Sequence, residues 1–409
     1  MKSLKNINIK PKKHNTGFSI VELMVAIAIG VIVLTGLIQV FDTSSKMNRT
    51  QNGLARIQEN GRYAISLMKQ TIEQTGYQYC FGESNKETAK EAQPTKVAWD
   101  VKSLPFIPGF GIGPFDPSYL LRGHECDAAG TCQPALNSLG SNTTAMIPAV
   151  GVSDGDRIAG TDVLTVRYIS GQGREIDSVA GNTLTLTSWS AANPPDTTTA
   201  PTPSSGQWLV VSCGTGISYP EVVTEIASST NTIVVTPNVK SDITLAKAFN
   251  MQRDFTTATY YVANNRVDDR DIPTLYSNFN GVTNAVIEGV DAFDVIYGVR
   301  DSQGLIRYLN ASGVESLTGA DCWPEVLNET NNTTLPNNQG CGWRSVVTID
   351  IHMLLNTIYN SSPNSNEEFR YSQYGGEFYN ESDLPSGINH YSMHRREFTT
   401  SIALKNIMQ

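Results

Sequence analysis

The sequence predicts an α+β protein, in which one long N-terminal helix packs on a large antiparallel, β-rich globular part. Three observations predict this class. Residues 18–38 form a long apolar run, residues 54–72 repeat apolar side chains at helical spacing, and many short alternating runs follow residue 160. A helix followed by many strands favours an antiparallel sheet that covers one face of the helix.

The apolar run at 18–38 has the length of a membrane-crossing helix. Its 21 residues include one charged side chain, Glu22, and about 20 helical residues span the hydrocarbon core of a bilayer. The preceding residues 1–17 carry five lysines and no acidic residue. Positive charge on this side predicts a cytoplasmic N-terminus and an extracytoplasmic remainder.

Two ordinary interpretations do not explain this segment. A secretory signal peptide ends in a small-residue cleavage site, and residues 39–45 contain no A-x-A pattern. A plain membrane anchor leaves Glu22 unexplained, because an ionised side chain in the apolar run costs about 2.5–3.5 kcal/mol on insertion scales. We therefore expect Glu22 to have a partner.

The junction Gly17-Phe18-Ser19-Ile20-Val21-Glu22 resembles the class III leader junction of type IV pilins and pseudopilins. The resemblance implies that a prepilin peptidase cuts between Gly17 and Phe18, that the new N-terminal Phe18 is N-methylated, and that Glu22 is the family's characteristic glutamate. Cutting frees an ammonium at Phe18, which the Glu22 carboxylate can meet in the same or a neighbouring subunit. Away from water, such an ion pair would fix the register of stacked helices.

The helix is expected to continue through residues 39–79, with no proline to interrupt it. Residues 42–53 are mostly polar. An apolar stripe then returns, which predicts packing against a sheet. Its members are Leu54, Ile57, Gly61, Ala64, Ile65, Met68 and Ile72, and the residues expected to be more exposed are Glu59, Arg62, Lys69 and Glu73.

A narrower resemblance is to the PilW-type minor pilins. It is carried by an Asn-Gly-Arg-aromatic-Ala-Ile segment at 60–65 with a Gly-Tyr…Cys turn at 76–80, and by segments at 160–168, 287–299 and 395–406. It implies a structural protein at or near the pilus tip that primes assembly, with roles in twitching, adhesion and DNA uptake. The implied partners are prepilin peptidase, other minor pilins, the major pilin and a large tip adhesin. The implied location is the bacterial inner membrane before assembly and the surface pilus afterwards.

The predicted organisation is a cleaved leader at 1–17, a transmembrane helix at 18–38, an amphipathic helix at 39–79 and a β-rich extracytoplasmic part at 80–409. Strands are predicted at 163–169, 183–189, 208–213, 221–226, 232–236, 258–263, 287–299, 304–309, 347–353 and 398–404. Segments 105–117 and 190–206 are rich in proline with glycine or with threonine and serine, so they are expected to be loops. Residues 81–150 and 311–340 match no pattern that would assign a ligand.

All six cysteines follow the membrane segment, where disulfides persist. Six cysteines allow fifteen connectivities; we expect Cys126–Cys132, Cys322–Cys341 and Cys80–Cys213. A zinc site would recruit His124 beside Cys126, but the sequence offers no second CxxC or histidine pair to complete a tetrahedral set. Disulfides are therefore favoured, and no metal or other cofactor is expected.

The sequence predicts no catalytic residue. His390 and His394 lack the glutamate of a zinc-protease helix, and His352 lies on the polar side of a predicted strand. The aspartates at 154, 156 and 162 and at 268, 269 and 271 do not fit a calcium loop and are expected to form turns. Removal of the five leader lysines changes the formal charge from −9 to −14, which disfavours direct nucleic-acid binding. The alternatives are a minor pseudopilin of type II secretion and, less favoured, a surface-anchored hydrolase or sugar-binding module.

Overall fold

The computed structural model describes residues 17, 19–76, 121–136, 147–187, 207–212, 221–229, 231–236, 245–250, 254–268, 270–301, 303–317, 327–328, 333–334, 341–358, 369–370, 378–379 and 393–405. The chain forms two compact units, residues 1–52 and residues 53–409, and each is described by itself below. Helix and strand content agree with the predicted α+β class.

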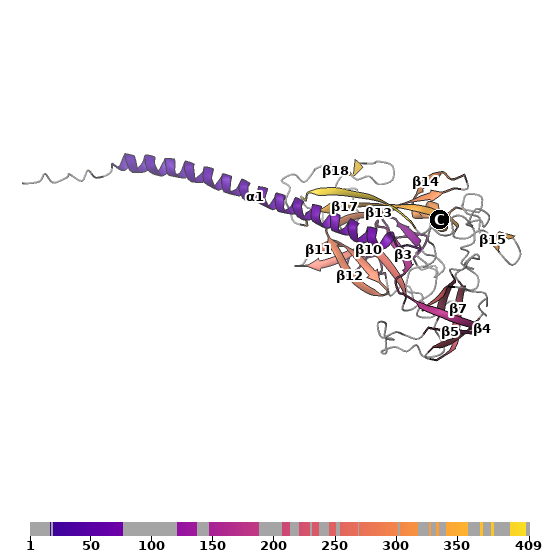
Figure 1. Cartoon of the computed structure of the whole chain (residues 1–409). Coiled ribbons are helices and arrows are strands. Elements are labelled where there is room, and N and C mark those ends of the chain that lie inside the picture. Colours follow the sequence, from indigo (N-terminus) through magenta and orange to yellow (C-terminus); the bar gives the residue numbers. More distant parts are fainter. Residues whose placement is uncertain are drawn as a thin grey trace, which may run out of the picture. The chain divides into compact units, whose positions relative to one another are not determined.

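A single helix, α1 (Ile20–Ile72), accounts for most of the N-terminal unit and continues into the second one (Figure 1). In the N-terminal unit almost every side chain of α1 is exposed. The hydroxyl of Thr35 donates to the carbonyls of Val31 and Ile32, so that this polar group is satisfied within the apolar run. Further along, Asp42 and Lys46 form an exposed ion pair of 2.7 Å.

In the second unit, the last five turns of α1 bury the predicted apolar stripe. Ile57, Ala64, Met68 and Ile72 are at most 2% exposed, and Leu54 and Ile65 pack against the same core at its margin. Glu59, Arg62 and Lys69 are exposed, as predicted. Thr71 is also buried; its hydroxyl bonds back to the Leu67 carbonyl at 3.1 Å.

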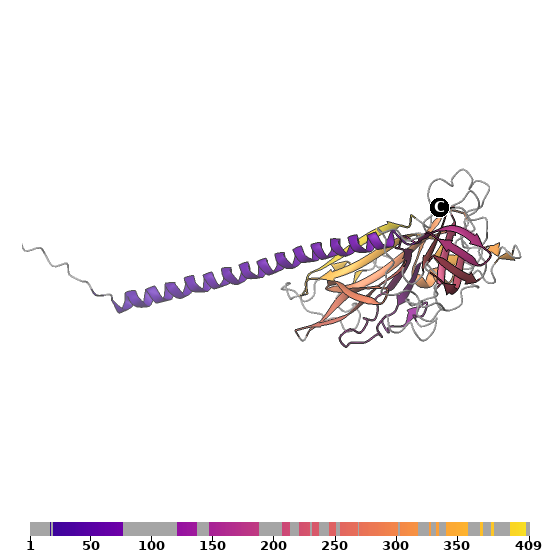
Figure 2. The same ribbon diagram turned by 60° about the horizontal axis from the view of Figure 1, so that its bottom comes forward.

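The first sheet of the second unit has six antiparallel strands. Their order is β12 (Val282–Glu288), β11 (Arg270–Phe279), β10 (Phe255–Val267), β3 (Val163–Ile169), β1 (Leu121–Cys126) and β2 (Cys132–Gln133). The second sheet has four antiparallel strands in the order β14 (Ile306–Leu309), β13 (Val290–Arg300), β17 (Val346–Asn356) and β20 (Arg395–Ala403). Both sheets and the stripe of α1 contribute to one hydrophobic core. Figure 2 shows the last turns of α1 running along strands of this unit.

A third assembly is a closed antiparallel barrel with its own hydrophobic core. Its strands in order are β4 (Arg174–Ala180), β5 (Thr183–Leu186), β8 (Thr232–Thr236), β7 (Glu221–Ser228), β6 (Gln207–Ser212) and β9 (Ala246–Asn250). The core side chains are Leu184, Leu186, Trp208, Val210, Val223, Ile233, Val235 and Ala248. No pattern in the sequence predicted that these strands close into a barrel.

Short elements complete the described part of the second unit. They are helices α2 (Ala311–Glu315) and α3 (Cys341–Arg344) and the two-residue strands β15 (Leu327–Asn328), β16 (Thr333–Thr334), β18 (Phe369–Arg370) and β19 (Phe378–Tyr379). The predicted loops at 105–117 and 190–206 lie outside the described residues.

Most predicted strands are found, and two coincide with their predicted bounds: β3 and β8. β17 alternates buried and partly exposed side chains from Val347 to Met353, as predicted. In β20 less exposed and more exposed side chains alternate from Phe398 to Ala403, and only Ile402 is buried. The predicted strand at 183–189 is shorter, because β5 ends at Leu186. Strands β1, β4, β9, β11 and most of β12 were not predicted, nor were the two-residue strands. β11 contains Pro273, and a proline ordinarily argues against an interior strand.

The predicted alternation of β3 is wrong in one respect, because all seven of its side chains are buried. Its polar members have polar partners on the adjacent strand β10. The Thr165 and Thr259 hydroxyl oxygens are 2.9 Å apart, and the Arg167 guanidinium donates to the Thr257 hydroxyl at 3.2 Å. These bonds allow polar side chains to lie inside.

Candidate assembly site

The helix begins with a capping box. The backbone N–H of Ser19 donates to a carboxylate oxygen of Glu22 at 3.0 Å, and the Ser19 hydroxyl accepts the backbone N–H of Val21 at 3.3 Å. Serine at the N-cap and glutamate three residues later satisfy backbone donors that the first turn leaves free. The Ser19–Glu22 segment of the leader junction is therefore also a helix start, which the sequence analysis did not state.

After this cap, α1 exposes apolar side chains on all sides. The exposed large apolar residues are Ile20, Val21, Leu23, Met24, Val25, Ile27, Ile29, Val31, Ile32, Val33, Leu34, Leu37, Ile38, Val40 and Phe41. By length and composition this is the one helix of the described chain that could cross a membrane. An apolar surface on every side of a helix is stable only in lipid or against other apolar helices.

Gly17 is exposed, and no atom lies within 4 Å of the position that a β-carbon on it would occupy. Phe18 lies outside the described residues. Cleavage between Gly17 and Phe18, N-methylation of Phe18 and its ion pair with Glu22 therefore stay predictions.

The expected Cys126–Cys132 disulfide is present and links β1 to β2. Both cysteines are buried, with exposed fractions of 6% and 5%. Cys80, Cys213 and Cys322 lie outside the described residues, as does the side chain of Cys341, so the other two expected pairs stay predictions.

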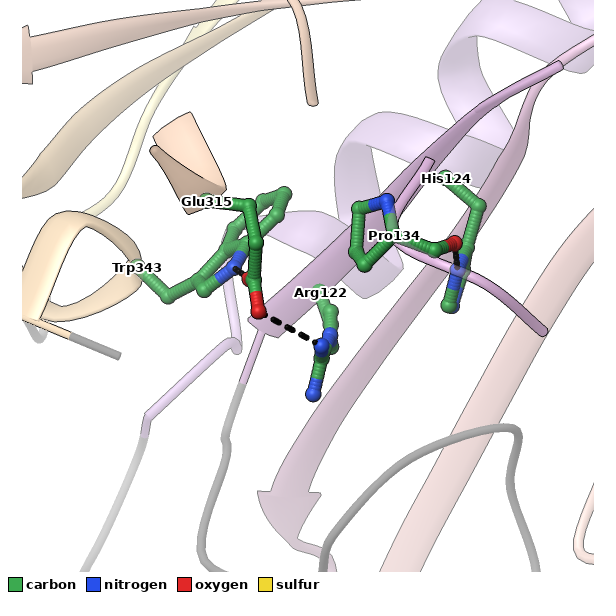
Figure 3. A network of polar contacts seen from close by, with 5 residues as sticks. All are labelled: Arg122, His124, Pro134, Glu315 and Trp343. Atoms are coloured by element: carbon green, nitrogen blue, oxygen red, sulfur yellow. Dashed lines mark hydrogen bonds and ion pairs between the residues drawn. The ribbon is translucent and has the colours of Figure 1, made fainter. Parts of the chain in front are cut away.

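The zinc alternative at His124 finds no support in the described part of the chain, where no group of three or more potential ligands could hold a metal ion. Nδ1 of His124 lies 2.6 Å from the Pro134 carbonyl oxygen (Figure 3), and Cys126 is used in the disulfide. Burial lowers the pKa of His124 to about 4, and the positive charges of Arg122 and Arg157 act in the same direction. His124 is therefore a neutral structural residue at neutral pH.

A second polar group on β1 connects it to the two short helices (Figure 3). The Glu315 carboxylate at the end of α2 accepts from the Arg122 guanidinium at 3.0 Å and from the indole nitrogen of Trp343 in α3 at 2.6 Å. Trp343 is 2% exposed and also contacts the ring of Tyr297 edge-on. One carboxylate therefore ties α2, α3 and β1 together.

Asp162, which was expected to form a turn, lies directly before β3 and connects two strands of different sheets. Its carboxylate accepts the backbone N–H of Cys126 on β1 at 3.2 Å and that of Val295 on β13 at 2.9 Å. Its own N–H donates to the Phe293 carbonyl at 2.8 Å. Asp162 thereby joins the two sheets, a role that the spacing of aspartates does not signal. Burial raises the pKa of Asp162 well above its usual value, and the nearby acidic groups of Glu125 and Asp294 raise it further.

The other aspartates behave differently from one another. Asp154 and Asp156 lie in the turn that begins at Ser153, as predicted. The Asp156 carboxylate accepts the Ser153 N–H at 2.8 Å, and the Asp154 carboxylate accepts the N–H of Arg266 at 2.8 Å. Asp268 has a positive φ of 49° in the turn between β10 and β11. Asp271 lies within β11 rather than in a turn, and Asp269 lies outside the described residues.

The remaining histidines form no catalytic arrangement in the described region. His352 lies on the partly exposed side of β17, as predicted, with Nδ1 3.9 Å from a Glu397 carboxylate oxygen. The carbonyl of His394 accepts from the Thr357 N–H at 3.1 Å. His390 lies outside the described residues.

A buried ion pair at one end of the four-stranded sheet also escaped the sequence analysis. The Asp291 carboxylate on β13 accepts from Arg395 on β20 at 2.6 Å and from the Asn356 amide on β17 at 2.5 Å. The Asp291 and Arg395 side chains are 0% and 4% exposed. The three residues lie on three neighbouring strands. The network therefore connects the edge strand β20 with the interior strands β17 and β13.

A capped apolar helix followed by a β-rich head, behind a class III leader, defines a type IV pilus-related pilin. The comparisons with known families agree. Residues 12–38 match the prokaryotic N-terminal methylation motif, and residues 259–406 match the family described as type IV pilus-assembly protein W. These two segments thus match a PilW-type pilin with a class III leader. No curated protein and no solved structure matches it. Both family matches point to a structural pilus-assembly protein rather than an enzyme.

Proposed function

We propose that this protein is a minor pilin that prepilin peptidase processes and that enters the type IV pilus at or near its tip, where it primes assembly. The observation that carries the proposal is the capped and largely apolar first part of α1, whose large apolar side chains are exposed from Ile20 to Phe41. Such a helix can move from lipid into a bundle of equivalent subunit helices, because both surroundings are apolar. The protein performs no reaction in this role.

In this proposal each predicted segment of the chain has its own role. Residues 1–17 are the leader, and residues 18–38 are the helix buried in membrane or filament. The rest of α1, which ends at Ile72, connects this segment to the β-rich part and packs in its core. The location is first the inner membrane, with a cytoplasmic N-terminus, and then the surface pilus. The partners are prepilin peptidase, other minor pilins, the major pilin and a large tip adhesin. The match to a pilus-assembly family favours this system over type II secretion.

The first test is the substitution Gly17→Ala in the native host. A side chain at the residue before the cut should block the peptidase, so we expect an uncut precursor that stays in the membrane and is missing from sheared pili. The measurement is the mass of the protein and its distribution between membranes and pili. Gly30→Ala is the matched control, because a β-carbon there also meets no atom within 4 Å. Normal processing of the Gly17→Ala variant would contradict the leader assignment.

A second measurement tests the role in priming. Deletion of the gene should reduce the number of surface pili and abolish twitching, and the wild-type gene in trans should restore both. Pili in normal numbers after deletion would refute a priming role while leaving the processing result intact.

A further inference from the structure

The barrel is inserted into a pair of adjacent strands. β3 ends at Ile169 and β10 begins at Phe255, and these two residues face each other across the antiparallel pair. Everything from β4 to β9 lies between them in the sequence. The chain therefore leaves the six-stranded sheet, builds a complete barrel and returns to the point of departure.

Short hydrogen bonds hold the two ends of the insertion together. The N–H groups of Ser170 and Gly171 donate to the Asp254 carbonyl at 2.8 and 3.1 Å. The Asp254 carboxylate accepts the N–H of Asn250 at 2.8 Å. A β-carbon on Gly171 would lie 2.3 Å from an Asp254 carboxylate oxygen, so this close approach requires glycine.

The barrel is also independent in its packing. Among the described strands, those of the barrel pack on one another, and none has an extended contact with a strand of the two sheets. Its core is separate from the core that contains α1. A segment with its own core and adjoining ends has the properties of an inserted domain.

The family match begins after the barrel in the sequence. The match to the pilus-assembly family begins at residue 259, within β10, and the methylation motif ends at residue 38. The barrel lies outside both. Strands β1 to β3 of the first sheet also lie before the matched segment, whereas β11 to β14, β17 and β20 lie within it and β10 lies at its edge.

We propose that residues 171–253 form an inserted module that the pilin does not need for assembly and that stays exposed on the filament. The inference rests on the proposed function, because it takes the chain to be part of a pilus. Its physical basis is that removing a self-contained barrel leaves the core shared by α1 and both sheets unchanged.

The test replaces residues 171–253 of the full chain by Asn-Gly between Ser170 and Asp254. This dipeptide favours a two-residue hairpin turn, and the two strands already face each other there. We expect the shortened protein to appear in sheared pili and to restore pilus number in the gene-deletion strain to the wild-type level. Degradation of the variant, or pili as few as in the deletion strain, would overturn the proposal.

Two controls separate this result from failure of the proposed function. Ile349→Asp places a charge in the core of the sheets, where Ile349 is 0% exposed, and should abolish incorporation. Absence of the wild-type chain from pili would refute the pilin role itself. Loss of the shortened variant alone would refute only the module.

Exposure is tested on intact pili with a membrane-impermeant maleimide. The end of β4 is exposed at Ala180, whereas Val235 in the barrel core is 0% exposed. We expect Ala180→Cys in the full chain to be labelled above the unsubstituted protein and Val235→Cys to remain unlabelled. Protection of Ala180→Cys in the filament would show that neighbouring subunits cover the barrel and would overturn its exposure.

Discussion

The ring of Phe398 on β20 lies 2.5 Å from the position that a β-carbon on Gly61 would occupy. Gly61 is buried and faces the core from the middle of the part of α1 that belongs to the second unit, residues 53–72. Any other residue there would collide with the ring. The glycine, an unfavourable residue inside a helix, is thus explained by the close approach of helix and strand.

Gly61→Ala should therefore destabilise the head, although alanine is the better helix former by about 1 kcal/mol. Overpacking of a filled core typically costs about 1–3 kcal/mol, and the collision is with a ring. The measurement is thermal unfolding of the purified chain in detergent. In a Phe398→Ala background the same substitution should become neutral or stabilising. A loss of equal size in both backgrounds would show that the ring is not the cause.

The helix and its stripe could be predicted because they depend on local repetition. The spacing of Ile57, Ala64, Met68 and Ile72 is set by 3.6 residues per turn, whatever packs against it. The Gly61–Phe398 contact joins residues far apart in the sequence, and no local pattern specifies such a pair. For the same reason, individual strands such as β8 were found, whereas their closure into a barrel was not.

The position of Asp162 leads to a prediction about pH. Its folded-state pKa is raised by burial and by Glu125 and Asp294, so above the unfolded value of about 4 the folded state binds more protons than the unfolded one. Stability from this group is fully present below that value and is lost as the pH rises through the folded pKa. The Asp162→Asn variant cannot titrate at this position. Its urea unfolding midpoint should therefore depend less on pH between the unfolded and the folded pKa of Asp162.

Asp162→Ala is the matched variant. It removes the carboxylate but leaves the N–H groups of Cys126 and Val295 without their acceptor. Each such loss costs about 1–3 kcal/mol, so the alanine variant should be less stable than the asparagine variant at every pH. Equal stabilities would contradict the role of Asp162 in joining the two sheets.

His124 should act in the opposite direction. Its pKa is lowered from 6.5 to about 4 in the folded state, so between these values the unfolded state binds more protons. Stability is therefore lost as the pH falls through this window, by at most about 1.4 kcal/mol per pH unit. His124→Asn keeps an N–H donor for the Pro134 carbonyl and does not titrate there. In urea titrations the variant should not show the loss of stability that the wild-type protein shows as the pH falls from 6.5 to about 4. An unchanged dependence of stability on pH would contradict the lowered pKa of His124.

The sites show the same limit of sequence reasoning as the fold. Cys126–Cys132 could be predicted because a short loop brings the two cysteines together. Asp162 was expected only to form a turn, since nothing near it in the sequence indicates that Val295 comes within hydrogen-bond distance. The Arg122–Glu315–Trp343 group was missed for the same reason, because β1 and the two short helices meet only in the fold.

Glu22 has two roles to separate: the helix cap that accepts the Ser19 N–H at 3.0 Å and the proposed ion pair with the freed amine of Phe18. Glutamine also serves at this position of a capping box, so Glu22→Gln keeps the cap and removes the charge. Ser19→Ala removes the capping hydroxyl and keeps the charge of Glu22, and loss of a serine N-cap costs about 1 kcal/mol. If the charge sets subunit register, the Gln variant should be processed but missing from sheared pili, whereas the Ala variant should be incorporated. The opposite pattern would show that Glu22 serves the helix start rather than the contact between subunits.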